Sequence, residues 1–160
     1  MPHPDAPTTS PLDDPPAAFV GRPFFAETVT LLRSVRDHDF DTLAALCDDD
    51  HGIVDIAPGG GSVPIRTRAE WEAWFHNLFA TLDTMGADTD SEITGYEAVE
   101  SDSMGYSVVD FRQTLTVGPS VATFDCIATI IWKLVDGRWQ ESRWHCSVLS
   151  SDVPPELAAP

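Results

Sequence analysis

Basic residues are scarce in this chain of 160 residues, and Lys133 is its single lysine. Nine lysine and arginine side chains stand against 26 aspartate and glutamate side chains, which gives a formal net charge of −17 at pH 7. So acidic a chain repels the phosphate groups of nucleic acids and of anionic lipids. We therefore expect neither a nucleic acid nor a membrane surface as its partner.

Cysteines and long apolar runs are also scarce. The three cysteines, Cys47, Cys126 and Cys146, are an odd number and lack the spacing of a disulfide framework or a metal site. No apolar run approaches the ~18 residues of a membrane-spanning helix, and the first residues lack the basic and apolar parts of a secretory signal. We expect a cytoplasmic protein with reduced thiols, no metal and no cofactor.

Proline and aspartate are concentrated near the two ends of the chain. Residues 1–22 show no hydrophobic periodicity, and their composition predicts a disordered tail. Residues 152–160 have a similar composition, which predicts a flexible C-terminal tail. The remaining segment, 23–151, is long enough for a single domain with its own core.

Helical periodicity is confined to the first half of the chain. A helix is expected within 23–39 and a shorter one within 39–47, which Asp39 or Asp41 can cap. A third helix is expected after Thr67, because Thr67 and Glu70 form a capping box. The apolar residues that follow it share one face at helical spacing: Trp71, Trp74, Phe75, Leu78, Phe79 and Leu82.

After Gly86 the hydrophobic period changes to two. Four long strands are expected, at 88–100, 104–117, 120–135 and 138–150, and a short strand at 52–58 is expected at an edge. Helices followed by strands predict an α+β fold, with three N-terminal helices packed on an antiparallel sheet. Strands this long must bend strongly to fit a small domain, and a bent sheet under helices leaves a concave cavity.

Four segments carry a family resemblance: "LLRSVRDHDFDTLAALCDDD", "AEWEAWFHNLF", "IIWKLVDGRW" and "WQESRWHCS". They resemble the nuclear-transport-factor-two-like superfamily, and within it the SnoaL-like group and the association domain of calcium/calmodulin-dependent kinase II. The resemblance covers most of 24–150, and its most specific part is Trp139 followed by His145 and Ser147. It implies a cone-shaped domain. The superfamily includes isomerases, cyclases, dehydratases, ligand binders and oligomerisation modules, so the fold alone does not define the function.

Alternation predicts which side chains enter the cone. On strand 104–117 we expect Tyr106, Asp110 and Arg112 to point inward, and Arg112 matches an arginine that the kinase domain directs into its pocket. Asp110 could then act as a catalytic acid or base while Arg112 binds an anionic or carbonyl oxygen; the alternative is a structural Asp–Arg pair. Four further residues complete the expected ligand-binding set: Ile130, Trp144, Cys146 and Trp74. Ile130 and Cys146 replace two pocket arginines of the kinase domain.

On strand 138–150, alternation places Glu141, Arg143, His145 and Ser147 on the opposite face of the sheet. That face is expected to be a dimer interface, as is common in the family. The residues predicted to form it are Ile127, Thr129, Ile131, Arg143 and His145. The acidic run 48–51, "DDDH", is interpreted as solvated charge rather than as a metal site, because four consecutive side chains diverge.

Two function classes remain open. The first is a small-molecule binder, including a cofactor-independent isomerase, cyclase or dehydratase, for an unknown organic ligand. The second is a non-catalytic dimerisation module with a vestigial pocket. A deep cavity favours the first class, and a cone filled by its own side chains favours the second.

Overall fold

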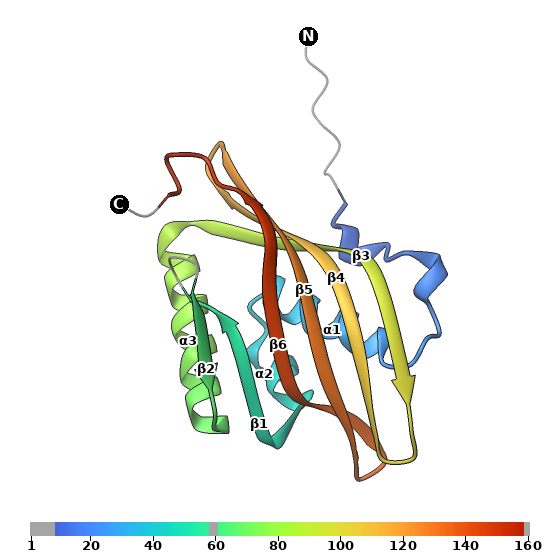
Figure 1. Ribbon diagram of the computed structural model, residues 1–160. Helices are drawn as coiled ribbons and strands as arrows, with labels where there is room; N and C mark the ends of the chain where they lie inside the picture. Colours follow the sequence, from blue (N-terminus) through green and yellow to red (C-terminus); the bar gives the residue numbers. More distant parts are fainter. Residues whose placement is uncertain (1–8, 58–60, 159–160) are drawn as a thin grey trace.

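The computed structural model describes residues 9–57 and 61–158, which form three α-helices and six strands (Figure 1). The elements are, in chain order, the 3₁₀ turns η1 (Pro11–Asp13) and η2 (Ala17–Phe19), α1 (Phe25–Arg36), α2 (Phe40–Ala45), β1 (Cys47–Ile56), β2 (Ser62–Ile65), α3 (Arg68–Met85), β3 (Ala87–Glu100), β4 (Met104–Val117), β5 (Ser120–Val135) and β6 (Arg138–Asp152). None of the described helices is long and apolar enough to cross a membrane. Three helices packed with one six-stranded sheet confirm the predicted α+β fold.

The six strands form one sheet in the order β2-β1-β6-β5-β4-β3. Figure 1 shows α1 and α2 behind this sheet, α3 beside β1 and β2, and β3 running from the end of α3 across to the far edge. We call the helix-covered face the inner face and the opposite one the outer face. The sheet is mixed rather than wholly antiparallel, because β1 runs parallel to β6. The strand expected at 52–58 corresponds to β1. It is not at an edge of the sheet, contrary to expectation, because β2 pairs with its other side.

Side-chain caps begin two of the helices where the sequence places them. Thr67 and Glu70 form the predicted capping box of α3, and Asp39 accepts a hydrogen bond from the backbone N–H of Thr42 at the start of α2. The helix α3 ends at Gly86, whose φ of 62° is costly for other residues. These local signals define where α3 begins and ends, and its apolar face is buried: Trp71, Phe75, Phe79 and Leu82.

The core lies between the helices and the inner face of the sheet. Five residues of β5 are fully or nearly fully buried there: Ala122, Cys126, Ala128, Ile130 and Trp132. Phe24 stacks on Trp132 with ring centroids 5.4 Å apart, and Phe75 packs between Trp71 and Phe79 on α3. Aromatic side chains therefore fill much of the cone.

Part of the expected N-terminal tail is packed against the domain. Leu12 is 1% exposed and belongs to the core, and its carbonyl oxygen accepts hydrogen bonds from the Arg33 guanidinium. Ser10 donates a hydrogen bond to the Asp90 carboxylate at 2.8 Å. The expectation of disorder is thus wrong for residues 9–22, because an apolar side chain anchors them. Residues 1–8 and 159–160 lie outside the described residues.

Candidate functional site

Adjacent strands β5 and β6 form the wall of the cone interior. Ile130 lies opposite Trp144, and Ala128 lies opposite Cys146. Cys146 is buried, and Trp144 and Trp74 are partly buried against the core, so the structure places these predicted residues on the inner side. The thiols of Cys126 and Cys146 neighbour each other on this wall, and this proximity together with burial raises the pKa of Cys146. This wall is apolar and contains a pair of thiols.

Asp55 of β1 supplies a carboxyl group on the same inner side, and the sequence analysis missed it. It shares a strand face with buried Ile53, whereas the intervening Val54 pairs with outward-facing His145. Although the residue as a whole keeps some exposure, protein surrounds its carboxyl group, and this burial raises the pKa. Among the described residues, its hydrogen bond comes from the backbone N–H of Ile56 at 2.9 Å. A carboxyl group that has no cationic partner within 9–57 and 61–158 is therefore held inside the cone.

Two other inner polar atoms have no hydrogen-bond partner among the residues that the structure describes. They are the indole Nε1 of Trp74 on α3 and the hydroxyl of Thr89 on β3. Buried polar atoms are nearly always satisfied in native proteins, so such exceptions point to a ligand, a water or an ion. Trp74 can only donate a hydrogen bond, whereas Thr89 can donate or accept one.

A second group of buried polar side chains lies where β1 begins beside β6. Cys47, His51 and Glu141 are 4%, 1% and 3% exposed, and one ligand atom from each lies within 4.8 Å of the other two. The Cys47 thiol contacts the Glu141 carboxyl oxygen Oε2 at 3.7 Å. The Nδ1 of His51 lies 3.3 Å from the Glu141 carbonyl oxygen. We call these three side chains the buried triad.

Burial dominates the protonation of the buried triad. It raises the pKa of Glu141 to about 8 and lowers the pKa of His51 to about 4. It also raises the pKa of the Cys47 thiol far above its ordinary range, with a further contribution from the nearby Glu141. Without a bound cation, all three groups are therefore neutral near pH 7.

Two expectations about these residues are wrong. His51 was interpreted as part of the solvated run 48–51, but its ring packs edge-on against Trp71 with centroids 5.1 Å apart. Glu141 was expected on the outer face. A β-bulge places Glu141 opposite Trp132 and Arg143 opposite Ile131, so both residues keep their ladder positions while Ser142 is extra. The bulge turns Glu141 inward.

The expected inward set on β4 is placed on the outer face. Ser107, Val109 and Phe111 are the buried residues of this strand. Tyr106 is 42% exposed, Asp110 shares its face, and the half-exposed Arg112 pairs with Asp125 of β5 at 2.9 Å. The assignment of Tyr106, Asp110 and Arg112 to the cone interior is therefore wrong. Burying the apolar side chains of Val109 and Phe111 is favourable, whereas the opposite alternation would have buried an arginine and an aspartate at a large cost in free energy.

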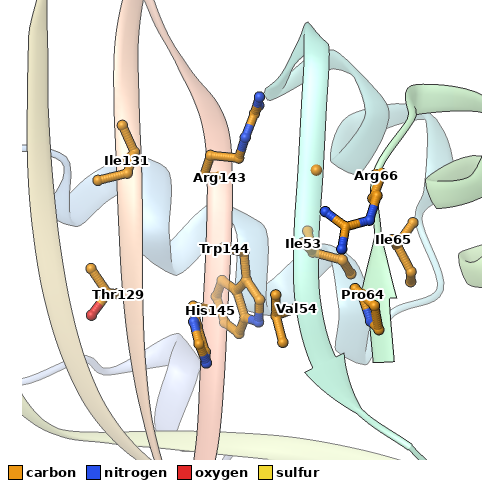
Figure 2. A pocket seen from close by; sticks show the side chains of 11 residues that line it. Ile53, Val54, Pro64, Ile65, Arg66, Thr129, Ile131, Arg143, Trp144 and His145 are labelled. Atoms are coloured by element: carbon orange, nitrogen blue, oxygen red, sulfur yellow. The ribbon is translucent and has the colours of Figure 1, made fainter. Parts of the chain in front are cut away.

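The five residues expected at a dimer interface do lie on the outer face, where Ile127 and Ile131 are half-buried and Thr129, Arg143 and His145 are exposed. A hollow of about 380 Å³ lies on this face. Figure 2 shows the side chains that line it, among them Thr129 and Ile131 from β5 and Arg143 and His145 from β6. Arg66, after β2, lines its other side, and Arg143 forms an ion pair with Asp50 at 3.3 Å.

A comparison with protein families matches the SnoaL-like domain over residues 28–151. A search of the curated proteins gives no match.

Solved structures with the same fold are similar to most of the chain. One is a candidate scytalone dehydratase from Novosphingobium aromaticivorans, at 13% identity and TM-score 0.68, covering 84% of this chain and 87% of that one. Another is the hexachlorocyclohexane dehydrochlorinase LinA-type3 from Novosphingobium barchaimii, at 13% identity and TM-score 0.63, covering 83% and 88%. A third is a candidate calcium/calmodulin-dependent protein kinase II association domain from Xanthomonas campestris, at 16% identity and TM-score 0.62, covering 78% and 84%. At these identities the likeness shows a shared fold, that of the nuclear-transport-factor-two-like cone.

Proposed function

The chain belongs to the SnoaL-like domain family, and from this premise we propose that it binds a small organic molecule on the inner side of its sheet. The observation that carries the proposal is the Asp55 carboxyl group, which is held inside the cone without a cationic partner among the described residues. Trp74 Nε1 and the Thr89 hydroxyl supply hydrogen-bonding atoms on the same side of the sheet. Ile130, Trp144 and Cys146 supply apolar contacts.

The chemistry that this arrangement supports best is proton abstraction without a cofactor. A carboxylate whose pKa is raised by burial is a stronger base than a solvated one, which suits removal of a proton from carbon. Two proteins of the same fold are named for eliminations, one a dehydratase and one a dehydrochlorinase. In such an elimination Asp55 takes a proton from carbon, the electrons of that C–H bond form the C=C bond, and the chloride or hydroxide leaves with the electrons of its bond to carbon. Trp74 or Thr89 hydrogen-bonds the group that accumulates negative charge.

A panel of cyclic hydroxy ketones, chlorinated cyclohexanes and small organic acids tests this proposal by thermal stabilisation and by turnover. The wild type is compared with Asp55→Asn, and Asp110→Asn makes the same change on the outer face as a control. We expect at least one compound to stabilise the wild type, with turnover lost in Asp55→Asn and retained in Asp110→Asn. Equal turnover in Asp55→Asn and wild type would contradict the role of Asp55.

A non-catalytic dimerisation module is the second candidate, and the packing of the cone favours it. Trp71, Ile130 and Trp132 are at most 1% exposed, so aromatic and aliphatic side chains occupy much of the interior. Failure of the whole panel to stabilise the wild type, together with a stable dimer, would support this candidate over the first.

Dimerisation through the outer face is proposed in either case. Val99, Met104 and Tyr106 are 42–51% exposed, and with Ile131 they line a second outer hollow of about 260 Å³. The candidate contact residues Ile127, Thr129, Ile131, Arg143 and His145 continue this surface across β5 and β6. Exposed apolar area of this kind is typical of an interface between subunits.

Sedimentation velocity at micromolar concentration tests the interface. We expect a homodimer for the wild type and a monomer for Ile131→Asp, which puts a charge into the middle of the outer face. Asn77→Asp adds a charge to the exposed side of α3 and should leave the dimer intact. A monomeric wild type, or a dimer that survives in Ile131→Asp, would contradict the assignment.

A further inference from the structure

We propose that the buried triad of Cys47, His51 and Glu141 binds a divalent transition-metal ion of the zinc class. A thiol, an imidazole and a carboxyl group are the three side-chain types that coordinate zinc in proteins. One ligand atom from each lies within 4.8 Å of the other two, although Glu141 of β6 is 94 positions from Cys47 of β1. This site goes beyond the proposed function, because neither Asp55 nor the ligand wall takes part in it.

The separation of the ligand atoms is close to what a tetrahedral ion requires. Metal–sulfur and metal–oxygen distances of about 2.3 Å and 2.0 Å place two ligand atoms roughly 3.5 Å apart around one ion. The Cys47 Sγ and Glu141 Oε2 atoms are 3.7 Å apart. Only small movements of these two side chains are therefore needed to accept the ion.

The histidine is already in the form that a metal needs. The Glu141 backbone carbonyl can only accept a hydrogen bond, so the contact at 3.3 Å requires the proton of His51 to sit on Nδ1. The Nε2 atom then carries a lone pair, and it has no partner among the described residues although His51 is only 1% exposed. Metal-binding histidines characteristically donate their other N–H to a carbonyl or carboxylate in this way.

Charge balance favours occupation of the site. A divalent ion with a thiolate, a carboxylate and a neutral imidazole forms a neutral unit, whereas the carboxylate alone is costly in this buried position. The charged neighbours include Arg68, whose guanidinium donates to the backbone carbonyls of Cys47 and Asp48, and Asp48, which pairs with Lys133. Arg143 also lies close enough to influence His51, and Asp55 close enough to influence Glu141. The carbonyls and Glu72 hold the Arg68 guanidinium, so it is not a direct partner of the buried triad.

The thiolate decides the class of metal. Calcium and magnesium prefer sites made of oxygen atoms alone, whereas a mixed sulfur, nitrogen and oxygen set favours zinc or cobalt. Three protein ligands leave one coordination position for water or another small ligand, as in zinc sites that are not purely structural.

Cobalt(II) titration of the chelator-treated full chain tests the site, because a thiolate bound to cobalt gives a charge-transfer absorption in the near ultraviolet. We expect the band to saturate at one cobalt per chain and to disappear when zinc is added. Cys47→Ser should abolish it, and Glu141→Gln should weaken cobalt binding at least about tenfold. The double variant Cys126→Ser/Cys146→Ser should keep it, because those thiols lie outside the buried triad.

Absence of the band in the wild type would overturn the proposal, and so would its persistence in Cys47→Ser or its loss in the double variant. Because Cys47→Ser removes a buried group and can fail to fold, zinc-edge X-ray absorption of the zinc-loaded wild type is an independent test. One sulfur with nitrogen or oxygen neighbours is expected. Two sulfur neighbours, or none, would exclude this ligand set.

Discussion

Replacing Glu141 by glutamine should change how the stability of the metal-free protein depends on pH. The Glu141 side chain is fully buried, and its pKa rises from an ordinary value of 4.5 to about 8 because burial disfavours the carboxylate. Above pH 4.5 the unfolded chain has released this proton, but the folded protein keeps it until pH approaches 8. The free energy of unfolding therefore falls with rising pH across this window.

The size of the effect follows from the two pKa values. At about 1.36 kcal/mol per pKa unit, ionisation of Glu141 removes about 5 kcal/mol of stability between pH 4.5 and 8. About 3 kcal/mol of this is already lost at pH 7. Glutamine has nearly the same shape and does not ionise, so the variant lacks this loss.

Urea unfolding of wild type and Glu141→Gln at several pH values, with a chelator present, measures the difference directly. We expect the free energy of unfolding of the wild type to decrease relative to the variant by about 1.4 kcal/mol per pH unit between pH 5 and 8. His51 has a lowered pKa and contributes stability that is lost as pH falls from 6.5 toward 4, but both proteins share this contribution. Parallel pH profiles, or a wild type whose free energy of unfolding rises relative to the variant with rising pH, would contradict a raised pKa for Glu141.

Three other variants test the packing and the orientation of the strands by chemical denaturation or melting temperature. Ser107→Ala should cost about 1–3 kcal/mol, since it removes the acceptor of the buried Trp132 indole N–H at 3.0 Å; an unchanged stability would contradict that hydrogen bond. Arg112→Ala should barely change the melting temperature, because the ion pair of Arg112 with Asp125 is solvent-exposed. A large decrease in melting temperature would contradict the outward orientation of Arg112. Gly105→Ala should lower the free energy of unfolding by about 1–3 kcal/mol, because a Cβ at this position would lie 2.5 Å from the Phe24 ring. An unchanged stability would contradict this close packing of Phe24 on Gly105.

The helices and one strand could be predicted because their patterns are unambiguous. The capping box at Thr67 and the aromatic stripe after it define α3, and β5 has a single apolar alternation that includes Ile130 and Trp132. In such segments the wrong phase would bury charged or polar side chains in place of a large apolar surface, so the periodicity has one solution.

The strand β4 could not be oriented in this way because both of its alternations contain apolar and polar residues. Tyr106 and Val108 precede Arg112 on one face, and Val109 and Phe111 lie on the other. The resemblance to the kinase association domain favoured Arg112 as an inward residue. Packing favours the face with Phe111, which contacts the ring of Trp144 at 6.2 Å between centroids.

The polar side chains of the interior escaped prediction because distant pairings place them. Asp55 is inward because β1 lies parallel beside β6, a pairing that local periodicity does not reveal. Glu141 is inward because of a bulge at Ser142, which shifts the alternation in the middle of β6. The one local signal for Asp55 is a carboxylate on the same strand face as Ile53, where a short strand would be expected to bury apolar side chains.

A crystal structure of the wild type with the most stabilising compound of the panel tests the proposed function most directly. We expect the molecule to lie on the inner side of the sheet, with a polar atom within hydrogen-bond distance of the Asp55 carboxyl group or of Trp74 Nε1. A molecule bound instead in the outer hollow beside Arg66 and Arg143, with the cone interior still filled by protein side chains, would contradict it.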